Sequence, residues 1–307
     1  MLTYTLRRIA GLVPTLFVLV SLSFFIIRLA PGGPFDQPQE LPPEIRANLD
    51  AAYGFDKPLI SQYGNYLAGV VQGDLGPSLR YRDFTVTELI TRGLPLSLTI
   101  GLAAALLAFF TGVPLGAYAA WRADSMADHA IMSFSMLGVV LPGFVVGPLL
   151  ALLFGIYWPI FRVGGYEPGV LSFLVLPVIT LALPVSAYIA RLMRNSVEEV
   201  LRANYIRTAR AKGLAARDVF LRHALRPALI PVVSYLGPAV AFVVTGSLVV
   251  ESVFGLPGSG RFLIQGAVDR DYPMVMGMIL VYGVLTLLCN LVADLLYAWL
   301  DPRVRLI

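Results

Sequence analysis

Residues 94–121 read LPLSLTIGLAAALLAFFTGVPLGAYAAW and contain no charged side chain. A helix of about 20 apolar residues is long enough to cross the roughly 30 Å hydrocarbon core of a bilayer. The rest of the chain is also apolar: 57% of the 307 residues are hydrophobic and only 14% are charged. Soluble domains have about 25% charged residues. The sequence therefore predicts an all-α integral membrane protein.

Six apolar stretches are predicted to cross the membrane. The first is longer than the apolar part of a secretory signal peptide and no Ala-x-Ala cleavage site follows it, so it is expected to be retained. The six predicted transmembrane helices cover residues 9–30, 94–121, 130–154, 170–190, 227–250 and 272–300.

Prolines and small residues distinguish these stretches from ordinary apolar helices. Gly112 and Gly116, like Gly143 and Gly147, are spaced four apart and predict faces where two helices approach closely. A proline inside a helix removes a backbone hydrogen bond, which neighbouring helices or a watery cavity must compensate. Bent helices are therefore favoured, either for ordinary packing or around a translocation path. The prolines concerned are Pro14, Pro95, Pro114, Pro142, Pro148, Pro177, Pro184, Pro231 and Pro238.

The distribution of basic residues predicts the orientation. Six spans place both termini on one side, and the loops of that side contain 14 of the 23 Lys and Arg residues. Because positively charged loops remain in the cytoplasm, both termini are expected to be cytoplasmic. The predicted division is residues 1–30 as N-terminus and first span, 31–93 as an external insertion, and 94–307 as a core of five spans. A cytoplasmic loop, residues 191–226, lies within that core.

The external insertion is acidic and is predicted to contain three short helices. The first begins near Pro43 and ends before Gly54, and the second covers residues 58–71. The third begins at Thr85, which forms a capping box with Glu88. The insertion is interpreted as a platform for a partner protein, and the alternative is a lid that packs on the spans and contacts no partner.

The chain lacks the residues that most enzymes need. Its two lysines, Lys57 and Lys212, are not followed by Ser or Thr, so a phosphate-binding P-loop is excluded. His129 and His223 lie far apart, and Cys289 is the single cysteine, so neither a metal site nor a catalytic group is predicted. The small excess of positive charge is explained by the cytoplasmic loops, and no nucleic acid is expected as a partner.

Few side chains mark a route through the membrane. Tyr235, Glu251 and Asn290 could face a cavity, although a packing or lipid-interface role is an alternative for each. Glu251, at the predicted outer end of the fifth span, and Asp294, toward the inner end of the sixth, are the main intramembrane carboxylates. Because both lie near span ends, the mid-membrane carboxylates that ion-coupled carriers normally use are nearly missing, and an autonomous secondary carrier is the less favoured hypothesis.

The cytoplasmic loop contains nine basic residues and more chain than a turn requires. Ser196 and Glu199 form a capping box that predicts the start of a helix, and Gly213 predicts its end. A second short helix is expected from Ala215 to Leu225. This basic surface loop is interpreted as a docking site for another protein, and the alternative is a loop that sets topology on anionic lipid.

Residues 204–214, NYIRTARAKGL, resemble the coupling-loop signature of the membrane subunits of bacterial ABC importers. The general family pattern is Glu-Ala-Ala-x-x-x-Gly. Arg207 occupies the Glu position, Thr208 and Ala209 occupy the two Ala positions, and Gly213 is the glycine. Arg in place of Glu is typical of the peptide-uptake branch.

Further matches to this family are distributed through the chain. They are LAPGGPF at 29–35, GDLGPS at 73–78, ESVFGLPGSG at 251–260, DLLY at 294–297 and LDPR at 300–303. The resemblance implies the transmembrane-domain fold of a type I ABC importer and the role of a permease subunit for oligopeptides or dipeptides in a bacterial inner membrane. A sibling importer for nickel, glutathione or a peptide antibiotic is the alternative, and the peptide length is not predicted.

The resemblance also implies partners. They are a second, similar membrane subunit, an external binding protein that delivers peptides, and two ATPase subunits that bind ATP and magnesium, so the chain itself needs no cofactor. The coupling loop is expected to dock into an ATPase subunit. The residues assigned to this docking are Tyr205, Arg207, Thr208, Ala209, Arg210, Ala211, Lys212, Gly213 and Leu214.

Overall fold

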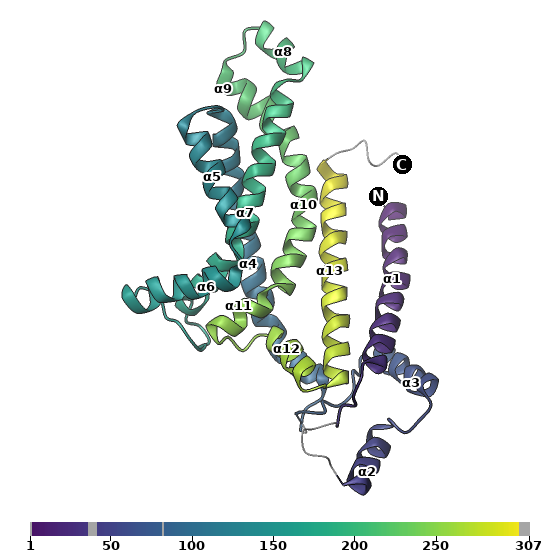
Figure 1. The fold of residues 1–307 in the computed structure, drawn as a ribbon. Coiled ribbons are helices and arrows are strands. Elements are labelled where there is room, and N and C mark those ends of the chain that lie inside the picture. Colours follow the sequence, from purple (N-terminus) through teal and green to yellow (C-terminus); the bar gives the residue numbers. More distant parts are fainter. Residues whose placement is uncertain (1, 36–41, 82, 301–307) are drawn as a thin grey trace. The chain divides into compact units, whose positions relative to one another are not determined.

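The computed structural model describes residues 2–35, 42–81 and 83–300, with side chains for those within 8–296. Helices account for most of these residues (Figure 1). The helices are α1 (Leu2–Leu29), α2 (Pro43–Tyr53), α3 (Leu59–Gln72), α4 (Val86–Trp121), α5 (Met126–Val140), α6 (Gly143–Ala151), the π-helix η1 (Leu152–Tyr157), α7 (Ser172–Leu201), α8 (Asn204–Ala211), α9 (Ala216–Asp218), the π-helix η2 (Val219–Ala224), α10 (Leu225–Thr245), α11 (Ser247–Phe254), α12 (Gly260–Val268) and α13 (Tyr272–Leu300).

The predicted all-α class is confirmed. The described residues contain one isolated β-bridge, between Pro77 and Thr85, and no strand. Two parts of the sequence interpretation lie outside the described residues. They are Arg82 and residues 301–307, which include most of the LDPR match and the basic residues Arg303 and Arg305.

Among the described residues, five helices are long and apolar enough to cross a membrane, and a bent pair counts as a sixth if it forms one span. The pair joins Met126–Val140 to Gly143–Tyr157 at an angle of 103°. The helix of the third predicted span, residues 130–154, is therefore broken at Leu141 and Pro142, in agreement with the bent helices that the prolines favour. Pro142 disfavours helical dihedrals in the preceding residue, and Leu141 is accordingly extended, with φ −75° and ψ 120°.

Helix α4 combines two elements that the sequence predicted as separate. The capping box is present, because the Glu88 backbone N–H donates to Thr85 Oγ1 at 3.2 Å and the Thr85 N–H donates to Glu88 Oε2 at 2.9 Å. The helix that begins there continues without a break through the predicted second span to Trp121. The third helix of the insertion is therefore the start of this span.

The chain divides into two compact units. Unit 1 comprises Met1–Ile9, Leu96–Pro257 and Leu285–Ile307, and unit 2 comprises Ala10–Pro95 and Gly258–Val284. The two units are defined by contacts between residues, whereas the predicted division at residues 30 and 93 separates segments on different sides of a membrane. The predicted topological boundaries at residues 30 and 93 therefore stay predictions.

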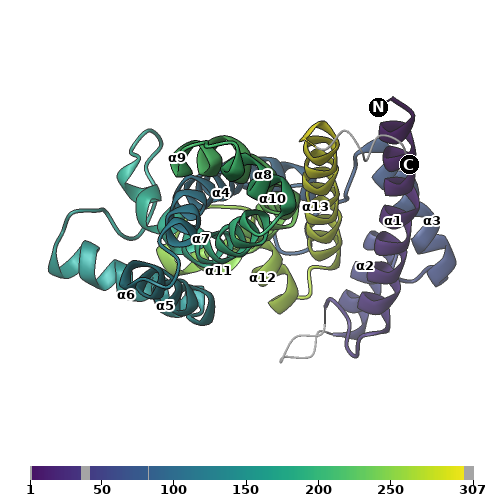
Figure 2. The ribbon, with the colours of Figure 1, turned by 90° about the horizontal axis from the view of Figure 1, so that it is seen from above.

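Helix α7 is the centre of unit 1, with α4, α5 and α10 around it (Figure 2). The close approach of α4 to α7 depends on glycine, because a Cβ on Gly112 would lie 2.7 Å from the Ser186 carbonyl oxygen. A Cβ on Gly116 would clash with the Ala190 carbonyl oxygen. The hydroxyls of Thr111 and Ser186 are hydrogen-bonded at 2.8 Å across the same interface. The small face predicted from this glycine pair is confirmed.

In unit 2 the first two predicted helices of the insertion are confirmed as α2 and α3. Each ends at a glycine in the left-handed region, Gly54 with φ +70° and Gly73 with φ +77°. Helix α3 packs on α1 through aromatic rings, with the Phe24 ring centroid 5.3 Å from that of Tyr63 and 5.8 Å from that of Tyr66.

The buried carboxylate of Asp271 is one of the groups that connect the two chain segments of unit 2. Asp271, fully buried, accepts hydrogen bonds from Ser78 Oγ and from the backbone N–H groups of Leu79 at 3.0 Å and Arg80 at 3.2 Å. Its second oxygen accepts from the Met274 N–H at 3.1 Å and caps α13. The turn before α4 is therefore held by a residue almost 200 positions later in the chain.

Candidate coupling site

The predicted docking helix is α8, which lies directly beyond the end of α7 (Figure 1). The chain turns between them at Arg202 and Ala203, where Ala203 is extended with φ −68° and ψ 150°. The predicted helix start at Ser196 is wrong, because α7 continues through Ser196, which is buried, to Leu201. Residues 191–201 contain neither Gly nor Pro, so nothing ends the span helix before that point.

Helix α8 has a buried face and an exposed face. Ile206, fully buried, and Ala209 pack against Val219 and Ala224 of η2 and against the last residues of α7. This cluster attaches α8 to the end of α7. Ala209 was predicted to contact a partner protein, but its side chain packs against residues of its own chain.

The exposed face contains most of the other predicted docking residues. Tyr205, in the first turn of α8, is 48% exposed, and Leu214, just after the helix, is 43% exposed. Two large side chains with apolar surface therefore face solvent at the two ends of α8. Arg207, Arg210 and Lys212 form no ion pair with any described residue. An exposed cationic surface with apolar neighbours can bind an acidic protein surface or anionic lipid. The remaining predicted residues on this exposed side are Thr208, Ala211 and Gly213.

Gly213 ends α8 as predicted. Its φ is +80°, a conformation that glycine adopts without steric cost. The Gly213 N–H donates to the Arg210 carbonyl at 3.0 Å, and the Leu214 N–H donates to the Ala209 carbonyl at 3.4 Å. These two bonds form the Schellman motif, which satisfies carbonyl groups that the helix end leaves open.

The second predicted helix of the loop extends beyond its expected end. Instead of stopping before Pro227, α9 and η2 continue into α10, and Pro227 lies in the first turn of α10. Proline removes one backbone hydrogen bond from this continuous helix, and the wider π-helical turn η2 directly precedes it. The Phe220 ring of η2 lies 4.7 Å from the Trp121 ring at the end of α4. The loop is therefore attached to α4 as well as to α7.

A buried ion pair near the loop was not predicted. Arg194 of α7 donates from Nε and Nη2 to the two carboxylate oxygens of Asp128 in α5, each at 2.7 Å, and Asp128 is 2% exposed. Glu198 accepts a third bond from Arg194 at 3.1 Å. Charged residues at span ends were visible in the sequence, but a single sequence contains no signal that pairs positions 66 residues apart.

The three predicted passage residues do not form one cluster. The Tyr235 ring lies 4.3 Å from the Tyr188 ring, whereas Glu251 is fully buried and accepts from Ser247 Oγ at 2.7 Å. Asn290 lies on α13 where α13 approaches Gly237 of α10. In the described part of the chain, no hydrogen bond or ring contact joins Tyr235, Glu251 and Asn290, and their role in a passage stays a prediction.

No group of three or more His, Cys, Asp or Glu side chains suited to a metal ion occurs among the described residues. Asp294 pairs instead with Arg8 at 2.9 Å.

Two family models match the chain. The binding-protein-dependent transport system inner membrane component matches residues 112–306, and the N-terminal model of the same membrane components matches residues 1–99. The chain belongs to this family of transport components. Together with its apolar helices, this membership makes the chain a multi-pass membrane protein of the permease type.

Relatives of this transport component match over their full length. The oligopeptide transport system permease protein OppB of Haemophilus influenzae is 47% identical over 305 residues, which cover 99% of this chain and 100% of the relative. OppB of Salmonella typhimurium gives the same values. The dipeptide transport system permease protein DppB of Bacillus subtilis is 37% identical over 306 residues, 100% of this chain and 99% of the relative.

Solved structures confirm the predicted fold of the transport component. A membrane chain of the inward-facing MetNI methionine ABC transporter superposes with a TM-score of 0.55 at 17% identity, covering 69% of this chain and 96% of that chain. An amino acid ABC transporter crystallised with histidines gives a TM-score of 0.54 at 21% identity, covering 69% and 94%. The fold is that of a type I ABC importer membrane domain.

Proposed function

We propose that this chain is one of two membrane subunits of an ATP-driven importer of oligopeptides or dipeptides. The observation that carries the proposal is the 47% identity to an oligopeptide permease over the whole of both chains. The chain forms the passage together with a second, similar subunit and is not itself an enzyme. ATP and magnesium are bound by two partner ATPase subunits, because this sequence has no P-loop.

The exposed face of α8 is the part of this chain that docks into an ATPase subunit. Tyr205 and Leu214 supply apolar contact area, and Arg207, Arg210 and Lys212 supply charge for an acidic surface. Thr208 and Ala211 are small enough for a groove to approach the helix backbone. Arg stands at position 207 where importers of other branches have Glu, so the matching ATPase surface differs in charge.

Movement of the ATPase subunits reaches the spans through the inner face of α8. Ile206 and Ala209 attach α8 to α7, and the contact of Phe220 with Trp121 attaches the loop to α4. Because these contacts are packed side chains, a displaced α8 moves the ends of both helices. Such displacement biases the spans between inward-facing and outward-facing arrangements.

The remaining assignments follow from the same proposal. Both termini lie in the cytoplasm, and the insertion at residues 31–93 receives the external binding protein. Tyr235, Glu251 and Asn290 are candidates for contact with the peptide in the passage.

Purification in mild detergent with a C-terminal tag tests the proposal. Mass spectrometry is expected to identify a second six-span subunit and ATPase subunits. Double charge reversal, Arg207→Glu with Arg210→Glu, is expected to remove the ATPase subunits and abolish peptide uptake while the second membrane subunit remains. The matched control is Arg217→Glu, an exposed reversal on α9 outside the docking face.

Three results would contradict this assignment. Normal ATPase recovery and uptake in the double variant would remove the role of α8. Solute movement by the isolated chain without ATP would favour a secondary carrier. Competition by nickel or glutathione, with no competition by peptides, would assign the chain to a sibling importer of the same branch.

A further inference from the structure

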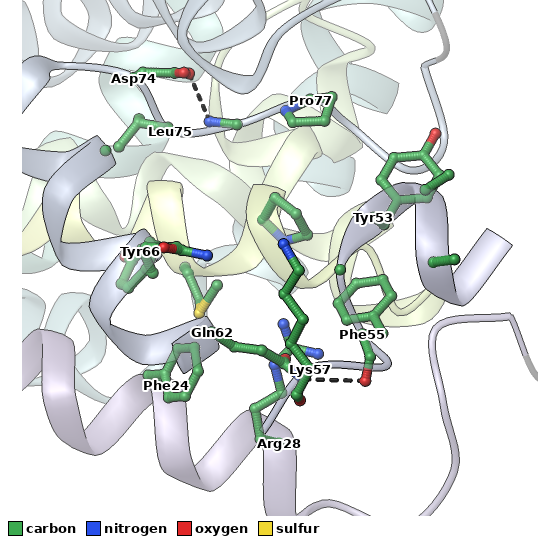
Figure 3. A pocket seen from close by; sticks show the side chains of 18 residues that line it. Phe24, Arg28, Tyr53, Phe55, Lys57, Gln62, Tyr66, Asp74, Leu75 and Pro77 are labelled. Atoms are coloured by element: carbon green, nitrogen blue, oxygen red, sulfur yellow. Dashed lines mark hydrogen bonds between the residues drawn. The ribbon is translucent and has the colours of Figure 1, made fainter. Parts of the chain in front are cut away.

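Unit 2 contains a cavity of about 380 Å³ (Figure 3). Arg28 and Phe24 of α1, Gln62 of α3 and the loop residue Lys57 surround the same space. Ligand pockets in proteins begin at about 300 Å³, so the cavity has room for a small organic molecule and is larger than a single ion requires.

The guanidinium group of Arg28 has no anionic partner among the described residues. It lies among three aromatic rings, with its central carbon 4.3 Å from the ring centroid of Phe55, 5.3 Å from Tyr272 and 5.5 Å from Phe24. Its Nε is buried and donates no hydrogen bond. Aromatic contact holds the guanidinium in place but leaves its donors for another group.

On the same wall, Gln62 has an acceptor oxygen that receives no hydrogen bond. Its Nε2 donates to the backbone carbonyls of Phe55 at 3.1 Å and Lys57 at 2.7 Å, and these two acceptors fix the orientation of the amide. The other end of the amide, Oε1, is buried and accepts nothing. Among described residues, Arg28 Nε and Gln62 Oε1 are the two buried side-chain polar atoms without a partner, and both residues line this cavity.

The charge of the cavity favours an anion. Arg28 and Lys57 are two cations on the wall and Asp74, which accepts from the Gly76 N–H at 2.9 Å, is its one carboxylate, so positive charge is in excess. The Tyr66 hydroxyl is neutral and adds no negative charge, and burial raises its pKa further, to about 12. Apolar lining comes from Phe24 and Met276.

A ligand that satisfies this wall needs an anionic acceptor for Arg28, an N–H or O–H donor for Gln62 and an apolar part. The last residue of a peptide has all three, because its carboxylate, its amide N–H and its side chain share one carbon. Guanidinium groups bind carboxylates through two parallel hydrogen bonds. We propose that the cavity between α1, α3 and the loop after α2 binds the C-terminal carboxylate of a short peptide.

The choice of a peptide as the source of this carboxylate rests on the proposed function. The chemistry of the cavity does not, so binding is tested directly and apart from transport. The tagged complex is placed in nanodiscs of phosphatidylcholine, and saturation-transfer NMR measures the binding of trialanine and of its C-terminal amide.

Trialanine is expected to bind at least tenfold more tightly than its amide. Arg28→Lys, which keeps the charge but loses the planar fork, is expected to weaken trialanine binding at least tenfold. Lys57→Glu changes an exposed side chain that makes no hydrogen bond through its amine, so it tests the site without loss of folding, and it is expected to abolish binding. The matched control is Arg92→Lys, whose guanidinium lies 4.6 Å from the Phe84 ring outside the cavity.

Equal binding of trialanine and its amide, or unchanged binding by Arg28→Lys, would overturn the proposal. Loss of trialanine binding in nanodiscs of phosphatidylglycerol, or displacement by inorganic phosphate at lower concentration than trialanine, would assign the cavity to phosphate groups instead. Absence of peptide uptake with carboxylate-selective binding intact would count against the proposed function alone. Uptake without such binding would overturn the site alone.

Discussion

At the scale of single residues, Gly213 determines where the exposed helix α8 ends. Its φ of +80° and its two flanking hydrogen bonds define the Schellman motif, and open space surrounds the position that a Cβ would occupy. A substitution therefore acts through the backbone and not through a clash. Because only the backbone conformation is affected, Gly213 is suited to a controlled substitution.

Gly213→Ala is expected to destabilise the end of α8 by about 1 kcal/mol, because alanine disfavours positive φ. Recovery of ATPase subunits should fall about fivefold at limiting concentration, while membrane insertion stays intact. Gly213→Asn should lose less, since asparagine tolerates the left-handed region. Quantitative mass spectrometry of the purified complex measures both effects.

The matched control is Gly164→Ala, because Gly164 has φ +82°, has open space around it and lies outside the loop. It has the same backbone cost and should leave ATPase recovery unchanged. An equal loss in both variants would mean that general instability, and not the end of α8, causes the effect.

At the scale of elements, the sequence predicted which segments are helical, but it did not predict where one helix runs into the next or where a helix breaks. The glycines that end α2, α3 and α8 act locally, so the sequence shows them directly. Ser196 matches a capping box, yet a helix that is already formed passes through it because no glycine or proline interrupts the chain. Pro142 shows the opposite case, in which a residue counted inside a span breaks it.

The ion pair between α5 and α7 belongs to this scale. Asp128→Asn is expected to lower the stability of the complex by about 3 kcal/mol, because it leaves a mostly buried guanidinium without its bidentate partner. Glu198→Gln removes the more exposed partner of the same arginine and should cost less than about 1 kcal/mol. Thermal unfolding in detergent compares them, and equal losses would show that burial of Asp128 contributes nothing.

At the scale of the whole molecule, the class of fold and the exposed helix α8 with its end at Gly213 followed from the sequence. The cavity and the Asp128–Arg194 pair did not, because each joins residues far apart in the chain. Arg28, Gln62 and Lys57 have no motif in common, and only folding places them around one space. The sequence also showed that an insertion exists, but not which of its surfaces is free.

Helix α2 has no buried residue, and Ile45 on it is 49% exposed. If the insertion is a platform, Ile45→Glu should weaken capture of the external binding protein at least tenfold and leave ATPase recovery unchanged. Surface plasmon resonance with the complex in nanodiscs measures the affinity. The control is Val71→Glu on α3, also exposed, and unchanged affinity in Ile45→Glu would favour a lid without a partner.

The hydrogen bonds of Asp271 impose an order on biosynthesis. The ribosome produces the turn at residues 78–80 long before the carboxylate that holds it, and the entire continuous segment Leu96–Pro257 emerges in between. Unit 2 therefore completes its folding only when residues 258–284 have left the ribosome. A chain released before that point contains helix α8 but lacks a completely folded unit 2.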